Sequence, residues 1–187
     1  MPLNHCGTQT IETERLVLRR YRESDAQDVF DNWASDPEVT KHLTWKPHDN
    51  VEATCDIVNK WVESYDNPEF YLWVIARKGT DMPIGAIDMR HCEGHKTCCL
   101  IGYCLSSKYW SRGIMTEATR AVIHFGFDTV GFERIQSYHH VENPASGRVM
   151  QKSGMLHEGT LRKYGVRNDG GLSDCEMYAI IKDDLNK

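Results

Sequence analysis

The stretch KYWSRGIMTEA, residues 108–118, decides how the rest of the chain is interpreted. It follows an apolar run, Cys98–Leu105, that has the length and composition of a buried strand. Behind it, apolar residues recur at helical spacing from Ala118 to Phe125. The sequence therefore predicts a strand, a short loop and a helix that begins near Gly113 and runs to about Asp128.

The start of this predicted helix has the features of an anion-binding site. The first N–H groups of a helix have no partner within the helix, and the helix dipole is positive at that end. Gly113 has no Cβ, so a ligand can approach its backbone closely. Arg112 stands where helices usually prefer an acid, and a bound pyrophosphate would offset its charge. A plain strand-to-helix turn with a surface arginine is the alternative, since neither of the two common nucleotide loops occurs.

Outward from this stretch, strand patterns alternate with helix patterns. Strands are predicted at Arg15–Arg20, Phe70–Ala76, Pro83–Arg90, Cys98–Leu105, Arg134–Val141, Met155–Tyr164 and Asp174–Ile181. Helices are predicted from an N-cap at Ser24, at Asn50–Ser64, at Gly113–Asp128 and between Asn143 and Gly154. Short loops favour antiparallel neighbours, and strand–helix–strand steps favour parallel ones. The order predicts an α+β fold of three layers: a mixed, mostly antiparallel sheet with helices on both faces.

The length and composition are those of one folded domain. The 187 residues predict one domain, over residues 11–183, with a short extension at residues 1–10. A net charge of −5 argues against a nucleic-acid partner and suits a cationic substrate. The first ten residues have no targeting pattern, and the uncharged stretch Thr97–Ser107 is too short to span a bilayer. We therefore expect a cytoplasmic protein without a membrane partner.

The seven cysteines are expected to be free thiols, because their number is odd and no export signal is visible. The stretch HCEGHKTCC, His91–Cys99, raises zinc as an alternative. Its potential ligands share one hairpin, however, and Cys98 and Cys99 would point to opposite faces of a strand. The sequence therefore predicts no metal.

Several motifs together resemble one known family. Ile101–Leu105 followed by Tyr109–Ala118 resembles the coenzyme A motif of the GNAT acetyltransferases, and more narrowly that of the ribosomal-protein N-acetyltransferase (RimJ/RimL-type) branch. Glu12–Leu16, Pro83–Gly85, Glu142–Ser146, Lys152–Met155 and Glu158-Gly159 resemble further segments of that branch in the same order. The similarity covers roughly Ile11 to Ile181. It departs from the general superfamily motif at Trp110, which stands at a Gln/Arg position, and at Met115, which replaces a small residue.

This resemblance implies how a cofactor would bind. The family has a sheet splayed between its fourth and fifth strands, here Cys98–Leu105 and Arg134–Val141, with acetyl-CoA in the cleft. The pantetheine arm would pair with the strand near Cys104–Ser106, and the pyrophosphate would lie on the amides of Ser111–Thr116. The implied cofactor-binding residues are Cys104, Leu105, Ser106, Ser111, Arg112, Gly113, Ile114, Met115, Thr116, Asn143, Ser146 and Lys152.

Acetyl transfer needs a neutral amine, a polarised carbonyl and a protonated leaving thiol. Many relatives protonate the thiol with a tyrosine, but that position is Met150 here. The resemblance makes Ser146 the candidate proton donor and gives Asn143 the role of orienting the pantetheine or the acetyl group. Asn143 before Pro144 is also a typical N-cap, and Ser146 is compatible with an ordinary first-turn serine.

The remaining site residues follow from strands and loops near the expected cleft. Asp88, Glu158 and His139 are candidates for the base or for substrate contact, and each is also compatible with a solvated strand position. Trp45 lies in a loop that roofs the acceptor site in relatives, and plain helix–sheet packing is its alternative. The predicted catalytic set is Ser146, Asn143, Glu158 and Asp88, and the predicted substrate contacts are Trp45 and His139.

The sequence thus predicts an acetyl-CoA-dependent N-acetyltransferase that acts on a primary amine by direct attack in a ternary complex. A protein or peptide N-terminal α-amine is the first expectation because of the branch resemblance. A polyamine, antibiotic or amino-acid acceptor is the alternative, as is a non-catalytic acyl-CoA-binding module, since fold does not fix function. The sequence leaves a homodimer open.

Overall fold

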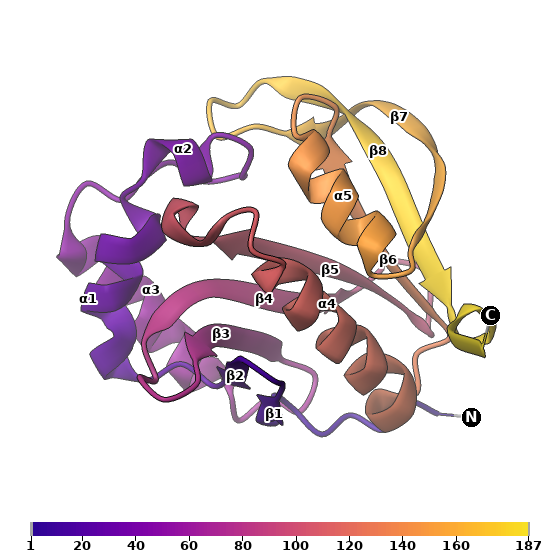
Figure 1. The fold of residues 1–187 in the computed structure, drawn as a ribbon, viewed down its shortest axis with the longest axis horizontal. Coiled ribbons are helices and arrows are strands. Elements are labelled where there is room, and N and C mark those ends of the chain that lie inside the picture. Colours follow the sequence, from indigo (N-terminus) through magenta and orange to yellow (C-terminus); the bar gives the residue numbers. More distant parts are fainter. Residues whose placement is uncertain (1, 187) are drawn as a thin grey trace.

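One eight-stranded sheet forms the centre of the molecule, in the order β1-β2-β3-β4-β5-β6-β8-β7 (Figure 1). The computed structural model describes residues 2–186. The strands are β1 (Ile11–Glu12), β2 (Leu16–Arg19), β3 (Tyr71–Arg77), β4 (Pro83–His91), β5 (Cys98–Leu105), β6 (Arg134–His140), β7 (Leu156–Val166) and β8 (Leu172–Ile181). All neighbours are antiparallel except β5 and β6, so the mixed, mostly antiparallel sheet is confirmed.

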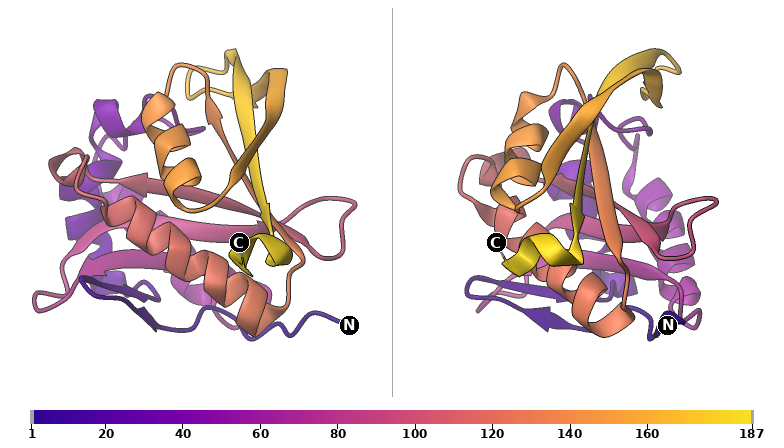
Figure 2. Two further views of the ribbon diagram at one scale, coloured as in Figure 1. Left: turned by 45° about the vertical axis from the view of Figure 1, so that its right-hand side comes forward. Right: turned by 90° about the vertical axis from the view of Figure 1, so that its right-hand side faces the viewer.

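Helices cover both faces of this sheet (Figure 2). The helices are α1 (Ala26–Val29), α2 (Pro37–Thr40), α3 (Val51–Ser64), α4 (Ile114–Phe125) and α5 (Pro144–Lys152), with 3-10 turns at Glu23–Asp25, Ser107–Tyr109 and Lys182–Asn186 and π-helical turns at Phe30–Ala34 and Gly126–Val130. One apolar core lies between the sheet and α4 with α5 and includes Trp73, Ile101 and Val122. A second core lies on the opposite face, between the sheet and α1 with α3, and includes Trp33 and Val58.

The sheet opens between β5 and β6. Only Cys98, Cys99 and Leu100 pair with β6, opposite residues 134–136. Ser137 Oγ donates a hydrogen bond to the carbonyl of Ile101 at 2.8 Å just beyond the last pair. From there the strands diverge, so the outer half of β5 has a free edge that faces the first turn of α5. The splay predicted between these two segments is therefore present.

The first helical segment begins differently from the prediction. Ser24 was expected to be the N-cap, but Arg22 precedes the first turn and the Asp25 carboxylate accepts a hydrogen bond from the Arg22 amide at 2.8 Å. The two Asp25 oxygens also accept hydrogen bonds from Arg19 at 2.8 and 3.0 Å. The predicted cap is wrong because the acid that caps the segment is the one that pairs with a buried arginine.

Three further features were not predicted. The short strand β1 pairs with β2, and α2 begins after Asp36, whose side chain accepts from the Glu38 amide at 2.9 Å. The N-terminal segment packs on the domain, because Gly7 N donates to the carbonyl of Pro68 at 2.8 Å. Among residues 2–186, no helix combines the length and the apolar character that crossing a bilayer requires.

Candidate active site

The loop that leads into α4 exposes a row of backbone donors. Gly113 has φ +74° and caps the helix in the left-handed region, and Ser111 also has a positive φ of 60°. Within residues 2–186, the amides of residues 111–116 form no hydrogen bond, and the first amide that does is Glu117 N, to the carbonyl of Gly113 at 3.0 Å. A Cβ on Gly113 would meet only an Arg15 nitrogen, at 3.6 Å, so the approach to these amides is open. The donors and the helix dipole fit a diphosphate.

The first turn of α4 is fixed by the turn between β1 and β2. Glu117 Oε1 accepts hydrogen bonds from Thr13 Oγ1 at 2.6 Å and from Arg15 N at 2.9 Å, and Oε2 pairs with Arg15 Nε at 2.6 Å. Arg15 also donates to the carbonyl of Arg112 at 3.0 Å. Burial alone would raise the pKa of Glu117, but these donors outweigh it and the pKa is lowered. The anion-binding loop is therefore held in shape before any ligand binds.

The end of β5 meets this loop. The Trp110 indole donates to the carbonyl of Leu105 at 2.8 Å, which explains why a tryptophan is suited to this position of the motif. Ser106 is fully buried, and its hydroxyl has no hydrogen-bond partner among residues 2–186. A buried hydroxyl without a partner costs free energy, so this group is suited to a ligand in the cleft. Cys104 lies on the other face of the sheet, against the second core.

Across the gap, Ser146 meets a residue that was not predicted. Tyr103, on β5, places its hydroxyl 2.8 Å from Ser146 Oγ and donates to the Ser146 carbonyl at 3.1 Å. Burial raises the pKa of the Tyr103 phenol above its usual value, which keeps it protonated. Asn143 caps α5, because its Oδ1 accepts from the Ser146 amide at 3.4 Å. Met150 is buried in the core. A tyrosine therefore does lie beside the serine, but it comes from the strand.

Asp88 lies on the opposite face of the sheet from this pair. It pairs with Gly102 across β4 and β5, and a Cβ on Gly102 would lie 2.7 Å from Asp88 Oδ1. The absence of a side chain at Gly102 thus lets the carboxylate lie over β5, next to the free edge. Desolvation raises the pKa of Asp88 to about 6, although the Arg90 guanidinium, 2.7 Å away, works against the shift.

The other two base candidates lie elsewhere. Glu158 is paired with Arg134, which lowers its pKa, and Arg134 lies opposite Cys98 at the closed end of the splay. That end is about 16 Å along β5 from Tyr103. His139 is buried under α5, where a Cβ on Gly147 would meet its Nε2 at 2.5 Å. Asn143 and Ser146 therefore lie together at the start of α5, and Asp88 lies on the opposite face of the sheet. Glu158 lies at the closed end of the splay, and His139 lies under α5.

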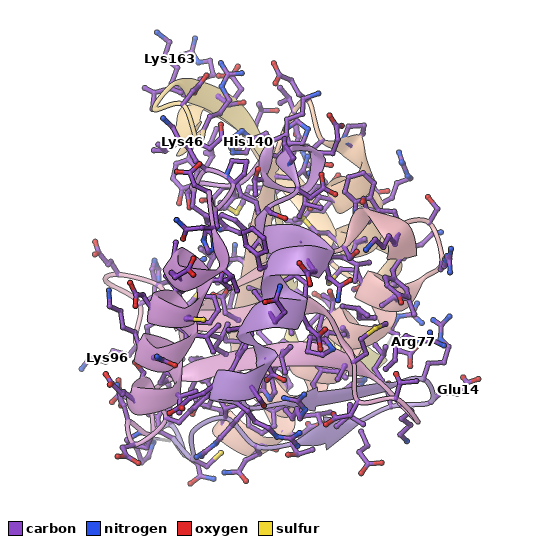
Figure 3. All side chains as sticks on the ribbon, turned by 90° about the vertical axis from the view of Figure 1, so that its left-hand side faces the viewer. Glu14, Lys46, Arg77, Lys96, His140 and Lys163 are labelled. Atoms are coloured by element: carbon purple, nitrogen blue, oxygen red, sulfur yellow. The ribbon has the colours of Figure 1, made fainter. Side chains whose placement is uncertain are left out.

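Successive side chains of a strand point to opposite faces, so His140 points away from α5, to the face opposite His139. His140 is buried, and its ring centroid lies 6.2 Å from that of His42 in the loop after α2. Burial, together with the nearby charge of Arg167, lowers the pKa of His140, so the ring is neutral at neutral pH. Figure 3 shows His140 below the β7–β8 hairpin, whose strand β7 carries Lys163. The loop that carries His42 also carries Lys46.

This hairpin and loop roof the face on which Asp88 lies. Asn168, in the turn between β7 and β8, donates to the carbonyl of Thr40 at 3.0 Å. Trp45, in the same loop as His42, is half-buried and packs against the second core, as the packing alternative expects; its contact with a substrate stays a prediction. Lys152 lies at the far end of α5 with an exposed side chain, about 9 Å along the helix from Ser146.

Sequence reasoning missed the contacts that join distant segments. The partner of Ser146 was hidden because Tyr103 looked like one more apolar strand position. Glu117, in the first turn of α4, and the segment with Thr13 and Arg15 each belong to a recognisable motif. Nothing in the sequence shows that these two motifs are in contact. His140 carried a signal, since alternation along β6 gives His139 and His140 opposite faces.

Comparison with known proteins places this geometry in a family. The family described as "Acetyltransferase (GNAT) domain" matches residues 15–156. The chain is 30% identical over 172 residues to an uncharacterized N-acetyltransferase, YoaA, of Bacillus subtilis (strain 168), covering 92% of this chain and 96% of that protein. It is 31% identical over 103 residues to the ribosomal-protein-serine acetyltransferase of Escherichia coli (strain K12), covering 55% and 57%.

A solved structure agrees. The acetyltransferase (GNAT family) from Bacillus anthracis superimposes with a TM-score of 0.81 at 28% identity, covering 94% of this chain and 99% of that one. The splayed sheet and the donor-rich start of α4 are thus parts of an acyltransferase fold. The chain belongs to the GNAT acetyltransferase family, and it is an N-acetyltransferase by that membership. Enzymes of this family use acetyl-CoA as the acetyl donor.

Proposed function

We propose that the chain transfers acetyl from acetyl-CoA to the N-terminal α-amine of a protein or peptide, by direct attack in a ternary complex. The observation that carries this proposal is that a candidate proton acceptor and a candidate proton donor lie on either side of the gap between β5 and β6. Asp88 lies beside the open edge of β5 on one face, and Ser146 with Tyr103 lies at the same edge on the other.

The residues around the gap fit the donor. The free amides of residues 111–116 hold the pyrophosphate, and the Ser106 hydroxyl and the free edge of β5 are available to the pantetheine arm. The Asn143 side-chain NH2 is left for the pantetheine or the acetyl oxygen, because only Oδ1 is used in capping. Acetyl-CoA supplies a thioester whose carbonyl carbon bonds to the amine nitrogen while the carbon–sulfur bond breaks and the sulfur keeps the electrons.

Ser146 gives its proton to the leaving sulfur. The serine then recovers a proton from solvent through the Tyr103 hydroxyl, 2.8 Å away, while the proton that Asp88 accepted is released to solvent, so that the cycle closes without a net change of charge. Because the raised pKa of Tyr103 keeps the phenol protonated at rest, the pair begins each cycle with both hydroxyl protons in place. Such proton transfer contributes typically about 10²–10⁴-fold to a rate.

Asp88 accepts the proton that the attacking amine loses, directly or through one water. A carboxylate with a pKa of about 6 is ionised at neutral pH and is a stronger base than an ordinary aspartate. It suits an α-amine, whose pKa is about 7.7–8.0, much better than a lysine amine near 10.4. This match in proton affinity supports an α-amine as the acceptor, and the name of the Escherichia coli relative, a ribosomal-protein-serine acetyltransferase, supports a protein acceptor.

The acceptor class is tested by measuring thiol release from acetyl-CoA with a panel of amines. The panel contains peptides beginning with Ser or Ala, the same peptides with a blocked N-terminus and one free lysine, a polyamine and an aminoglycoside. We expect the free α-amine peptides to have the highest kcat/KM and the blocked peptides to be at least tenfold slower.

A polyamine or aminoglycoside that reacts faster than every peptide would overturn the acceptor while leaving acetyl transfer intact. Binding of acetyl-CoA without thiol release for any amine would instead favour a non-catalytic acyl-CoA-binding module.

A further inference from the structure

A second group of polar side chains lies at the other end of the sheet. His5 comes from the N-terminal segment, Glu69 from the turn before β3, and His91 is the last residue of β4. One ligand atom from each lies within 4.8 Å of the others. The three line a surface hollow of about 690 Å³ beside the β4–β5 hairpin. In Figure 3 the hairpin residue Lys96 lies on the side opposite Arg77, which belongs to the cofactor end.

The two imidazoles are spaced as ligands of one ion. Their Nε2 atoms lie 3.4 Å apart, which is long for a hydrogen bond between ring nitrogens. Two zinc–nitrogen bonds of about 2.0–2.1 Å at a tetrahedral angle span about 3.4 Å. Glu69 adds a carboxylate oxygen, so the donor set is two nitrogens and one oxygen, which is a set that zinc accepts.

Each ligand stands on backbone that is already fixed. Asn4 N donates to the carbonyl of Val130 and Gly7 N to that of Pro68, both at 2.8 Å, so the segment is tied down on both sides of His5. Glu69 N donates to Asn67 Oδ1 at 2.9 Å. His91 pairs with Cys99 across β4 and β5.

The rings are also oriented. His5 Nδ1 lies 3.0 Å from the Tyr71 hydroxyl, which leaves Nε2 to face the cluster. A hydrogen bond to the second ring nitrogen is the usual support of a histidine that binds a metal. The His91 ring packs edge-on against Phe132, with centroids 5.4 Å apart. Little reorganisation is therefore needed for an ion to bind.

We propose that His5, Glu69 and His91 form a zinc-binding site with three protein ligands and one position open to water. The bound ion joins the N-terminal segment to the ends of β3 and β4, at the end of the sheet away from acetyl transfer, and its role is to stabilise the fold. The absence of metal predicted from His91–Cys99 rested on ligands within that hairpin, whereas two of these three come from other segments. The neighbouring thiols of Cys92 and Cys98 face each other at 3.2 Å and are not needed as ligands.

The test is calorimetry with zinc on tag-free protein first stripped with a chelator. We expect one equivalent to bind, and the melting temperature to rise by about 5–10 °C when free zinc exceeds Kd 100-fold. His5→Ala, His91→Ala and Glu69→Gln should each weaken binding at least tenfold, and His95→Ala, an exposed histidine of the same hairpin, should bind as the wild type does.

Cobalt provides a second readout that does not depend on stability. Co²⁺ in the site should show the intense visible absorption of tetrahedral coordination, and His5→Ala and His91→Ala should abolish it. The proposal is overturned if no zinc binds, if both histidine variants keep full affinity, or if His95→Ala removes the site.

Discussion

The hydroxyl groups of Tyr103 and Ser146 meet across the gap between β5 and α5. Tyr103 supports Ser146 from 2.8 Å, so neither group acts alone. In the proposed reaction the pair takes the place of a helix tyrosine at the Met150 position, because the Tyr103 phenol reaches the gap from the strand.

Ser146→Ala is expected to lower kcat about 100-fold, and Tyr103→Phe about tenfold, because each removes part of the proton supply to the sulfur. Calorimetry should show acetyl-CoA affinity within about twofold of wild type for both. If the residues act as one path, the double variant is no slower than Ser146→Ala. Additive losses would mean that Tyr103 serves another purpose, and unchanged turnover of Ser146→Ala would remove the serine from the reaction.

The raised pKa of Asp88 predicts how kcat depends on pH. In the wild type, kcat should rise as pH increases through about 6, as the carboxyl group loses its proton, and Asp88→Asn should lower kcat and lose this rise. A kcat profile unaltered in Asp88→Asn would assign the base to another group.

The same shift affects stability with a defined sign. The folded pKa of about 6 lies above the unfolded value of about 3.9, so the folded chain binds more protons between these values. The free energy of unfolding should therefore fall by roughly 1–3 kcal/mol as pH rises from 4 to 6, and Asp88→Asn should remove this part of the fall. Urea unfolding of both proteins across this range measures it.

The start of α4 depends on the left-handed backbone conformation of Gly113. Gly113→Val places a β-branched residue at φ +74°, which costs about 1–3 kcal/mol locally and distorts the free amides. We expect acetyl-CoA to bind at least tenfold more weakly by calorimetry. Gly131→Val is the matched control, because Gly131 also has a positive φ, of 89°, but follows the far end of α4. Equal loss of affinity in both variants would attribute the effect to general strain.

The entry to α1 rests on a buried ion pair. Arg19 and Asp25 have side chains only 7% and 6% exposed, so removing the acid leaves the buried guanidinium with the half-exposed Asp81 as its remaining acidic partner. Asp25→Ala should lower the free energy of unfolding by about 3 kcal/mol or more. Asp81, the other partner of Arg19, is 48% exposed, and Asp81→Ala should cost less than about 1 kcal/mol. Denaturant unfolding compares the two, and equal losses would contradict the assignment.

The sequence predicted correctly those parts of the fold that are determined by a local pattern of residues. The dense apolar run of β3, the helical spacing of α4 and the cap of α5 at Asn143 each show in a short window, and the resemblance supplied the splay. The predicted N-cap at Ser24 was wrong because Asp25, which pairs with the buried Arg19, also accepts the hydrogen bond that caps the first turn. Tyr103 with Ser146, Glu117 with Thr13, and His5 with His91 escaped prediction because each contact joins segments that only the folded sheet brings together.

The proposed reaction requires that the free amides of residues 111–116 bind the pyrophosphate of acetyl-CoA. Hydrogen–deuterium exchange of these amides, with and without saturating CoA, tests this directly. We predict fast exchange in the free protein and strong slowing with CoA, but not with pantetheine, which has no pyrophosphate. Exchange at residues 111–116 that is unchanged by saturating CoA would contradict the account.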